Sequence, residues 1–226
     1  MFEILKRILK KDEKIKSDNF EEKLLSKYGN CRERKKFNLK VLFIADTHDC
    51  LCYEKETIEY IKSMQDYDCC ILLGDHSAND LKEIMEIVPI NKIFGVLGNH
   101  DSWGKYEELG IENLNGRVIE INGVKIAGIS GSYKYKESKE YALYSHEESI
   151  EIANKMECAD ILVSHDKPFT EDNHNPAHDG LKGITEYLYK NNVPLNIHGH
   201  LHEDNEQILK NGTKSICLYK VRYMEL

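Results

Sequence analysis

The sequence predicts a mixed α/β domain of four layers, in which two mixed β-sheets pack face to face and helices cover their outer faces. Apolar runs alternate with helix-like segments through residue 97, which is typical of βαβ units with parallel strands. Asn122-Gly123 and Asn211-Gly212 each lie between two β-forming runs, so both pairs predict hairpins with antiparallel strands. Parallel and antiparallel strands in one chain fit best with two mixed sheets packed face to face and helices outside.

The composition is that of one large domain with an appendage. The chain has 226 residues, 41% of them hydrophobic, which is enough for a sizeable core. No apolar stretch approaches the ~20 residues of a membrane span and no signal-peptide pattern opens the chain, so we expect a cytoplasmic protein. Seven cysteines without two spaced zinc-binding pairs predict reduced, mostly buried thiols. A net charge of −8 argues against general nucleic-acid binding, but it is compatible with a small phosphorylated or nucleotide-like substrate.

Residues 1–38 differ from the rest and predict a basic, amphipathic helical extension to a domain over residues 39–226. Apolar residues recur at helical spacing between lysines near the start, and a second capped helix is expected over residues 20–29. We favour an appendage that packs on the body or on a second copy of the chain in a homo-oligomer. The alternative is peripheral contact of residues 1–16 with an anionic membrane surface.

The strands and helices follow from two different spacings of apolar residues. Short continuous apolar runs predict strands buried on both faces, whereas apolar residues three and four positions apart predict helices. In chain order, strands are expected at residues 41–45, 69–73, 93–97, 118–121, 124–127, 161–163, 193–197, 207–209 and 215–218, and helices at 56–64, 80–87, 147–156 and 181–190.

Polar residues that can bind metals follow five of the predicted strands. Ligands of open α/β sheets bind outside the carboxyl ends of strands, and glycine permits close backbone approach there. Asp46 and His48 share the parity of a strand, so we expect both to point the same way. The segments concerned are Asp46-Thr47-His48, Gly74-Asp75-His76, Gly98-Asn99-His100-Asp101, Ser164-His165-Asp166 and His198-Gly199-His200-Leu201-His202.

In order, these segments contain D-x-H, G-D, G-N-H-D, H and G-H-x-H. The series resembles the calcineurin-like metallophosphoesterase superfamily, in particular its small bacterial and archaeal members, over residues 40–202. The resemblance implies a centre of two divalent metal ions bridged by one carboxylate. Asp46, His48 and His202 would hold one ion. Asp75 would bridge to a second ion, whose other ligands would be Asn99, His165 and His200.

The resemblance also implies a metal and a mechanism. Oxygen and imidazole ligands without thiolate suit Mn²⁺, Fe or Zn²⁺, of which we expect Mn²⁺. A metal-bridging hydroxide would attack phosphorus, and His100 would be the catalytic histidine that protonates the leaving oxygen. Ala78 stands where the protein Ser/Thr phosphatases have an aspartate that orients this histidine, and no arginine follows it. Asp101, Asp80 or a water molecule would take that part, and Asp101 is counted with the catalytic residues.

The function expected from this resemblance is hydrolysis of a phosphodiester on a small or nucleotide-like substrate. The alternatives are a phosphomonoesterase (a phosphatase) and a non-catalytic scaffold of the same fold. Tyr133 and Tyr135, which alternate with lysines, are candidates for stacking a base, and His178 in the loop before Gly180 is a candidate substrate contact. For all three the alternative is an ordinary solvated loop.

Overall fold

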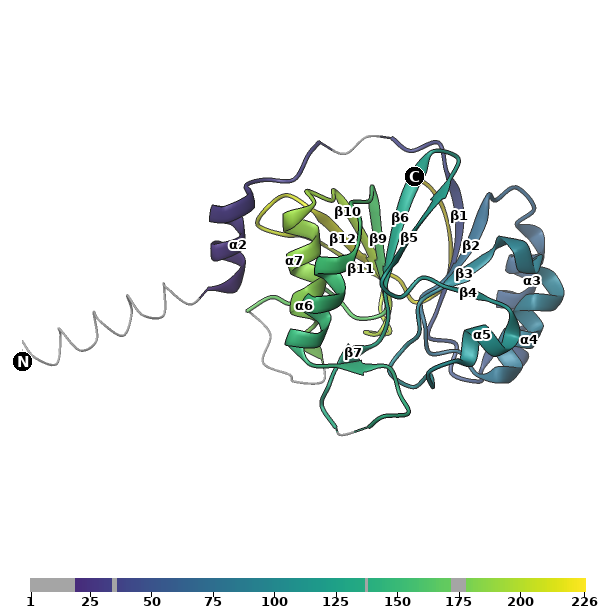
Figure 1. Ribbon diagram of the computed structural model, residues 1–226. Helices are drawn as coiled ribbons and strands as arrows, with labels where there is room; N and C mark the ends of the chain where they lie inside the picture. Colours follow the sequence, from purple (N-terminus) through teal and green to yellow (C-terminus); the bar gives the residue numbers. More distant parts are fainter. Residues whose placement is uncertain (1–18, 34–35, 137, 172–177) are drawn as a thin grey trace, which may run out of the picture.

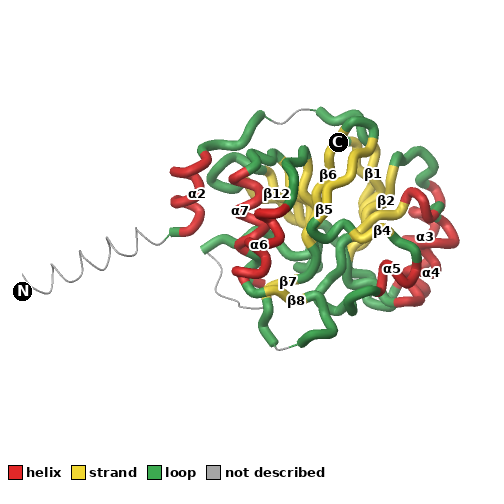
Figure 2. Tube along the Cα trace, viewed as in Figure 1, coloured by secondary structure: helices red, strands yellow, loops and turns green. Residues whose placement is uncertain are grey.

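The computed structural model describes residues 19–33, 36–136, 138–171 and 178–226. Two mixed sheets face each other, and helices cover the outer face of each, as Figures 1 and 2 show. The predicted four-layer fold is therefore confirmed. The first sheet has the strand order β13 (Lys220–Glu225), β1 (Lys40–Ala45), β2 (Cys69–Leu72), β3 (Ile93–Gly95), β4 (Glu112–Asn113).

The second sheet has six strands, and a separate pair of short strands lies near it. Its order is β11 (Asn205–Ile208), β12 (Lys214–Cys217), β10 (Leu195–His198), β9 (Ile161–Ser164), β6 (Val124–Ile129), β5 (Arg117–Ile121); the separate pair is β7 (Ser132–Tyr133) and β8 (Leu143–Tyr144). Inner strands of both sheets run parallel, whereas β13, β5 and β11 pair antiparallel at the margins. Asn122 and Gly123 have φ of 50° and 78°, as the predicted tight turn of the β5–β6 hairpin requires.

The hydrophobic core consists of three layers. The side chains of β1 alternate between two of them. Val41 and Phe43 pack between the sheets, while Leu42 and Ile44 pack under the helices of the first sheet. Those helices are α3 (Lys55–Ser63), α4 (Ala78–Ile87) and α5 (Lys105–Leu109), with short 3₁₀ turns at Leu51–Tyr53 and Ile90–Lys92. On the second sheet the covering helices are α6 (His146–Lys155), α7 (Lys182–Lys190) and α2 (Phe20–Tyr28).

Part of the N-terminal extension packs on the body. Helix α2 lies against α7, where the buried Glu21 carboxylate accepts a 2.8 Å hydrogen bond from the Tyr189 hydroxyl and Leu24 joins the core. Asn19 caps the helix at the position expected from the sequence. Residues 1–16 lie outside the described residues, so their contact with a membrane stays a prediction. Within the described part of the chain, no helix has the length and apolarity needed to span a membrane.

Two expectations from the sequence were incomplete or wrong. Strand β13, helix α5 and the β7–β8 pair were not predicted from the sequence. Strand β13 does alternate apolar and polar residues. Its partner β1 lies near the other end of the chain, so no hairpin turn indicated the pairing. The thiols are free, but they are not mostly buried. Cys69, Cys70 and Cys217 are buried, whereas the others are exposed or half-buried because they lie in loops or near them.

Candidate metal centre

The predicted metal ligands gather at one rim of the two sheets, where β1, β2, β9 and β10 end. Ligand atoms of Asp46, His48 and His202 lie within 4.8 Å of one another, and so do those of Asp46, Asp75 and His165. The carboxyl ends of parallel strands meet at such a rim, which is why residues far apart in sequence become neighbours here.

The loops after the strands, and not the strands themselves, aim these side chains. Strand β1 ends at Ala45, and Asp46 and His48 follow it with left-handed φ values of 51° and 47°. Asp46 and His48 do point to the same place, as expected, but left-handed loop backbone and not strand parity orients them. Three further predicted ligands share this unfavourable backbone region, with φ of 58° at Asp75, 73° at His200 and 53° at His202. Strained backbone in this density is typical of functional sites.

Glycines before the ligands allow the loops to touch. A Cβ at Gly98 would lie 2.1 Å from Asp75 Oδ1, and one at Gly199 would lie 2.6 Å from Asp46 Oδ2. Gly74 is equally crowded, because a Cβ there would lie 2.4 Å from the backbone nitrogen of Gly98. The expectation of close backbone approach at these glycines is confirmed.

The first ligand group is Asp46, His48 and His202. The Nε2 atoms of the two histidines are 2.9 Å apart, and His202 Nε2 is 3.7 Å from Asp46 Oδ1. Asp46 Oδ2 accepts a 2.9 Å hydrogen bond from the backbone N–H of His200. Asp46 Oδ1 is fully buried and has no hydrogen-bond partner among the described residues. A buried oxygen without a partner is costly unless a cation or donor meets it.

The second ligand group surrounds Asp75. Its Oδ2 lies 3.5 Å from His165 Nε2 and 3.8 Å from His48 Nε2, so the carboxylate stands between the two groups. Asn99 Oδ1 is 2.9 Å from His165 Nε2. On the other edge of its ring, His165 Nδ1 is 2.7 Å from the carbonyl oxygen of Leu73, which places the ring proton on Nδ1 and leaves the Nε2 lone pair for an ion.

The two carboxylates have opposite pKa shifts. Burial, reinforced by the negative charge of Asp75, raises the pKa of Asp46 to about 8. Burial also acts to raise the pKa of Asp75, but the facing imidazole of His165 and the N–H of His100 outweigh it and hold this pKa below its usual value. Burial lowers the pKa of His165, which keeps the imidazole neutral and able to coordinate.

These residues fit a pair of divalent cations. Nitrogen and oxygen ligands at ~2.1 Å from a cation lie ~3 Å apart when they meet at a right angle, close to the separations within both groups. Asp46 Oδ1 has no hydrogen-bond partner among the described residues, so a cation could neutralise its charge. Imidazole nitrogens crowd around Asp75 Oδ2, and a cation there could accept their lone pairs. Thiols are absent from both groups, so the donor set is the oxygen and imidazole set expected from the sequence.

An open pocket of about 360 Å³ leads to these groups. Tyr135 and His178 line it; the Tyr135 hydroxyl is 3.4 Å from Asn99 Nδ2 and the His178 ring is 5.1 Å from that of His200. The substrate contacts expected of these two residues stay predictions. Tyr133 does not line it. Its ring stacks at 4.4 Å on His146 instead, so the structure does not support a substrate contact for Tyr133.

The hydrogen bonds of the Asp101 carboxylate go to other described residues and not to the His100 side chain. Asp101 is 1% exposed, and its Oδ2 accepts 2.8 Å hydrogen bonds from the backbone N–H groups of Asp75 and Gly98. Its Oδ1 pairs with Lys105 Nζ at 2.6 Å. Asp101 therefore ties together the two loops that carry Asp75 and Asn99, which differs from the catalytic part expected from the sequence.

Sequence reasoning missed several residues around the centre. Lys105, in the unpredicted helix α5, neutralises Asp101, and Tyr219 stacks on His202 at 5.5 Å. Asp80 was considered for orienting His100, but its carboxylate bonds to the loop after His48. Lys105 and Asp101 are only four residues apart, and their pair was missed because helix α5 was not predicted. The contacts of Tyr219 and Asp80 join segments far apart in the sequence, so no local pattern indicates them.

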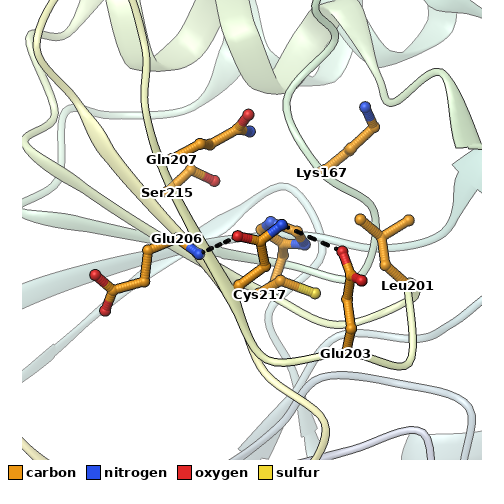
Figure 3. Close-up of a pocket in the computed structure, with 9 residues that line it drawn as sticks. Lys167, Leu201, Glu203, Glu206, Gln207, Ser215 and Cys217 are labelled. Carbon is orange, nitrogen blue, oxygen red and sulfur yellow. Dashed lines mark hydrogen bonds between the residues drawn. The ribbon is translucent and has the colours of Figure 1, made fainter.

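A second pocket lies on the other side of the segment that carries His200 and His202. It has about 230 Å³ and shares only Leu201 with the first. In Figure 3 the Lys167 amine and the Glu203 carboxylate lie on different sides of it. Glu206 lines it as well, so two glutamates face one lysine and the walls are unfavourable for a phosphate group.

Comparison with known sequences identifies the family. Residues 39–204 match the family described as calcineurin-like phosphoesterase, which spans all of the ligand segments. The chain belongs to the calcineurin-like phosphoesterase family. This family uses a centre of two divalent metal ions, and the Asp and His groups of this calcineurin-like chain lie where such a centre could form.

Individual relatives place the fold but not the substrate. An uncharacterised protein of Haemophilus influenzae is 27% identical and is aligned with 73% of this chain and 84% of its own. A phosphopantetheinyl hydrolase of Mycobacterium tuberculosis has a TM-score of 0.56 at 13% identity, covering 82% of this chain and 95% of its own. A dimetal phosphatase of Danio rerio has a TM-score of 0.51 at 13% identity, covering 82% and 88%. At these identities the two structures show a shared fold alone.

Proposed function

We propose that this protein is a dinuclear metal-dependent phosphoesterase that cleaves a phosphodiester in a small or nucleotide-like substrate. One observation carries the proposal. Asp75 lines an open pocket, and ligand atoms of the buried Asp46, Asp75 and His165 lie within 4.8 Å of one another. Asp46 Oδ1 has no hydrogen-bond partner in the described part of the chain. Two adjacent buried carboxylates of this kind are stabilised as anions by cations, and the pocket would admit a phosphoryl group beside Asp75.

Each ligand group has a distinct part in holding ions. Asp46, His48 and His202 would hold one ion, Asn99, His165 and His200 the other, and Asp75 would bridge the two. When bound, two such cations lower the pKa of the water between them and neutralise charge on the phosphoryl oxygens. We expect Mn²⁺ to support activity, with Fe or Zn²⁺ as alternatives.

His100 supplies the proton for the leaving oxygen in this proposal. Its side chain is 60% exposed toward the pocket, and its Nε2 lies 4.0 Å from Asp75 Oδ2. Its backbone N–H donates a 2.8 Å hydrogen bond to Asp75 Oδ1, so the position of the histidine is set by the shared carboxylate. A proton on Nε2 can reach a leaving oxygen in the pocket without moving the backbone.

Charge in the pocket favours a diester over a monoester. A phosphomonoester carries up to two negative charges at neutral pH, whereas a diester carries one. None of the described residues lining the pocket is lysine or arginine, so beyond the metal ions only histidines can balance substrate charge. Tyr135 and Leu201 offer aromatic and apolar surface for an esterifying group, and a volume of about 360 Å³ suits a small one.

Hydrolysis of two model esters tests the proposal. With Mn²⁺ added, we expect a higher kcat/KM for bis-p-nitrophenyl phosphate than for p-nitrophenyl phosphate, and loss of both activities in Asp75→Asn. A strong preference for the monoester would make the protein a phosphomonoesterase. Binding of two ions without hydrolysis of either ester would favour the scaffold alternative.

A further inference from the structure

The loop that carries His48 is held by the first turn of helix α4. Asp80, in that turn, is 1% exposed. Its Oδ2 accepts 2.7 Å hydrogen bonds from the Thr47 hydroxyl and from the backbone N–H of Asp49. Its Oδ1 accepts a 3.0 Å hydrogen bond from the backbone N–H of Leu51. One buried carboxylate thus receives three donors from residues on both sides of His48.

This loop needs such a support because of its backbone. His48 and Asp49 have φ of 47° and 63°, two consecutive left-handed residues that are not glycine. That conformation is unfavourable for residues with a Cβ and persists only where surrounding contacts impose it. Asp80 holds the N–H of Asp49, which is part of the strained pair, and the N–H of Leu51, two residues after it.

The rest of the turn reinforces the same loop. The Ser77 hydroxyl caps α4 by accepting a 3.0 Å hydrogen bond from Asp80 N–H, and it donates a 2.8 Å hydrogen bond to Asp49 Oδ1. The Thr47 hydroxyl, which donates to Asp80, is 2.9 Å from His76 Nδ1, so that nitrogen is the donor of their hydrogen bond. These contacts leave the loop with few other conformations.

The support ends at the candidate metal centre. The backbone N–H of His48 donates a 3.1 Å hydrogen bond to the carbonyl oxygen of Asp75, which fixes the loop against the shared carboxylate. In this position His48 Nε2 is 2.9 Å from His202 Nε2. The contacts of Asp80 with the loop therefore bear on where this imidazole lies.

We propose that Asp80 is a positioning residue for one of the two metal ions, the one assigned to Asp46, His48 and His202. It acts through the backbone of the loop and does not touch substrate or metal. The inference rests on the proposed function for its metal part, while the effect on the loop stands on the three hydrogen bonds that Asp80 accepts. It also replaces the expectation that Asp80 orients His100, because its carboxylate is engaged by the loop.

Asp80→Asn tests this proposal. The side-chain amide has one acceptor oxygen and two N–H donors, so it leaves at least one of the three loop donors without a partner. The matched control is Glu86→Gln, which removes an exposed carboxylate from the same helix. Two measurements are made on each variant: amide hydrogen exchange of residues 47–51 in the metal-free protein, and calorimetric titration with MnCl₂.

We expect faster exchange of residues 47–51 in Asp80→Asn and a loss of affinity for one Mn²⁺ of about 10- to 100-fold, the range typical for residues that orient metal ligands. The other Mn²⁺ should bind as in the wild type, and excess Mn²⁺ should restore most of kcat. Glu86→Gln should match the wild type in every measurement. Unchanged exchange together with two unchanged affinities would overturn the proposal.

A second variant tests the proposal in case Asp80→Asn does not fold. Thr47→Val removes only one of the three donors and should accelerate exchange of residues 47–51 to a smaller extent. If it leaves exchange unchanged, the proposal fails. A wild-type protein that binds fewer than two Mn²⁺ ions would instead contradict the proposed function, and the exchange comparison would still decide the part played by Asp80.

Discussion

Asp46 and Asp75 show how neighbouring carboxylates of the same chemistry can differ. Burial and the charge of its neighbour raise the pKa of Asp46 to about 8, while facing imidazoles hold that of Asp75 down against the effect of burial. Asp46 Oδ1 lacks a hydrogen-bond donor among the described residues, whereas both oxygens of Asp75 face N–H or imidazole groups. Their difference arises from what faces each oxygen, which no local sequence pattern encodes.

The first residue-scale prediction concerns His100. Glutamine keeps a polar side chain but cannot pass a proton to the leaving oxygen, so His100→Gln should lower kcat by about 100-fold or more. Its affinity for Mn²⁺ should stay near that of the wild type, because the side chain lies 4.0 Å from Asp75 Oδ2 and is assigned to neither ligand group. Steady-state kinetics and calorimetric titration measure the two quantities. Full kcat in a normally metallated variant would contradict the assignment.

The second prediction separates Tyr135 from Tyr133. Tyr135 lines the pocket, so Tyr135→Ala should raise KM for a diester with an aromatic group by several-fold, about 1 kcal/mol of lost stacking. Tyr133 stacks on His146 away from the pocket, so Tyr133→Ala serves as the matched control and should leave KM unchanged. Equal effects of the two substitutions on KM would show that neither ring contacts substrate specifically.

At the scale of elements, strands bring the loops to the rim and glycines let the loops pack. Strand β1 and its parallel neighbour β2 end side by side, so Asp46 and Asp75 become neighbours. The loops then pack too closely to leave room for a side chain at Gly98. A Cβ added there would lie 2.1 Å from Asp75 Oδ1. The loops that carry Asp46, Asp75 and Gly98 therefore determine the geometry of the site together, because each is shaped by its contacts with the others.

A substitution at Gly98 tests this close contact. Gly98→Ala places its Cβ against Asp75 Oδ1, so it should displace the shared carboxylate, abolish binding of at least one Mn²⁺ and destabilise the fold by about 1–3 kcal/mol. Gly110→Ala is the control: no atom lies within 4 Å of its Cβ, and its left-handed φ should cost about 1–2 kcal/mol without changing metal binding. Urea unfolding and metal titration measure both effects. Normal metal binding by Gly98→Ala would argue against a rigid contact.

At the scale of the whole molecule, the rim joins the two halves of the fold. His200 N–H binds Asp46 Oδ2 across 154 residues, and His165 binds the carbonyl of Leu73 across 92. Loops that follow strands of the first sheet carry Asp46, His48, Asp75 and Asn99. Loops that follow strands of the second sheet carry His165, His200 and His202. A metal centre at this rim would therefore link the two sheets.

Metal removal tests that link. A ligand at 100 times its Kd stabilises a folded protein by about 2.7 kcal/mol, and each kcal/mol shifts Tm by roughly 2–4 °C at this size. Chelated protein should therefore gain about 5–10 °C in Tm when Mn²⁺ is restored. In Asp46→Asn the gain should be at most half as large, because that variant lacks a ligand of one ion. Differential scanning calorimetry measures the shift, and an unchanged Tm in the wild type would contradict a metal centre that joins the sheets.

Much of this architecture could be predicted from the sequence, because its signals are local. Apolar runs such as the one before Asp46 showed strands buried on both faces, and Asn122-Gly123 showed a hairpin. The order of short polar motifs indicated which residues would meet, and all seven predicted ligands do lie at one rim. The alternation of β13 was also present in the sequence, but only its pairing with β1 gave it a place.

The tertiary structure decided where each of those side chains points. Strand parity did not orient Asp46 and His48, because both have left-handed backbone in the loop after β1. Asp80 of helix α4 holds that loop. Asp101 looked catalytic beside His100, yet it is buried and ties two loops together. Hydrophobic periodicity encodes which residues enter the core, whereas the direction of a loop side chain depends on hydrogen bonds to partners tens of residues away. That is why the sequence alone determined the strands and the set of ligands, and only the folded chain determined their geometry.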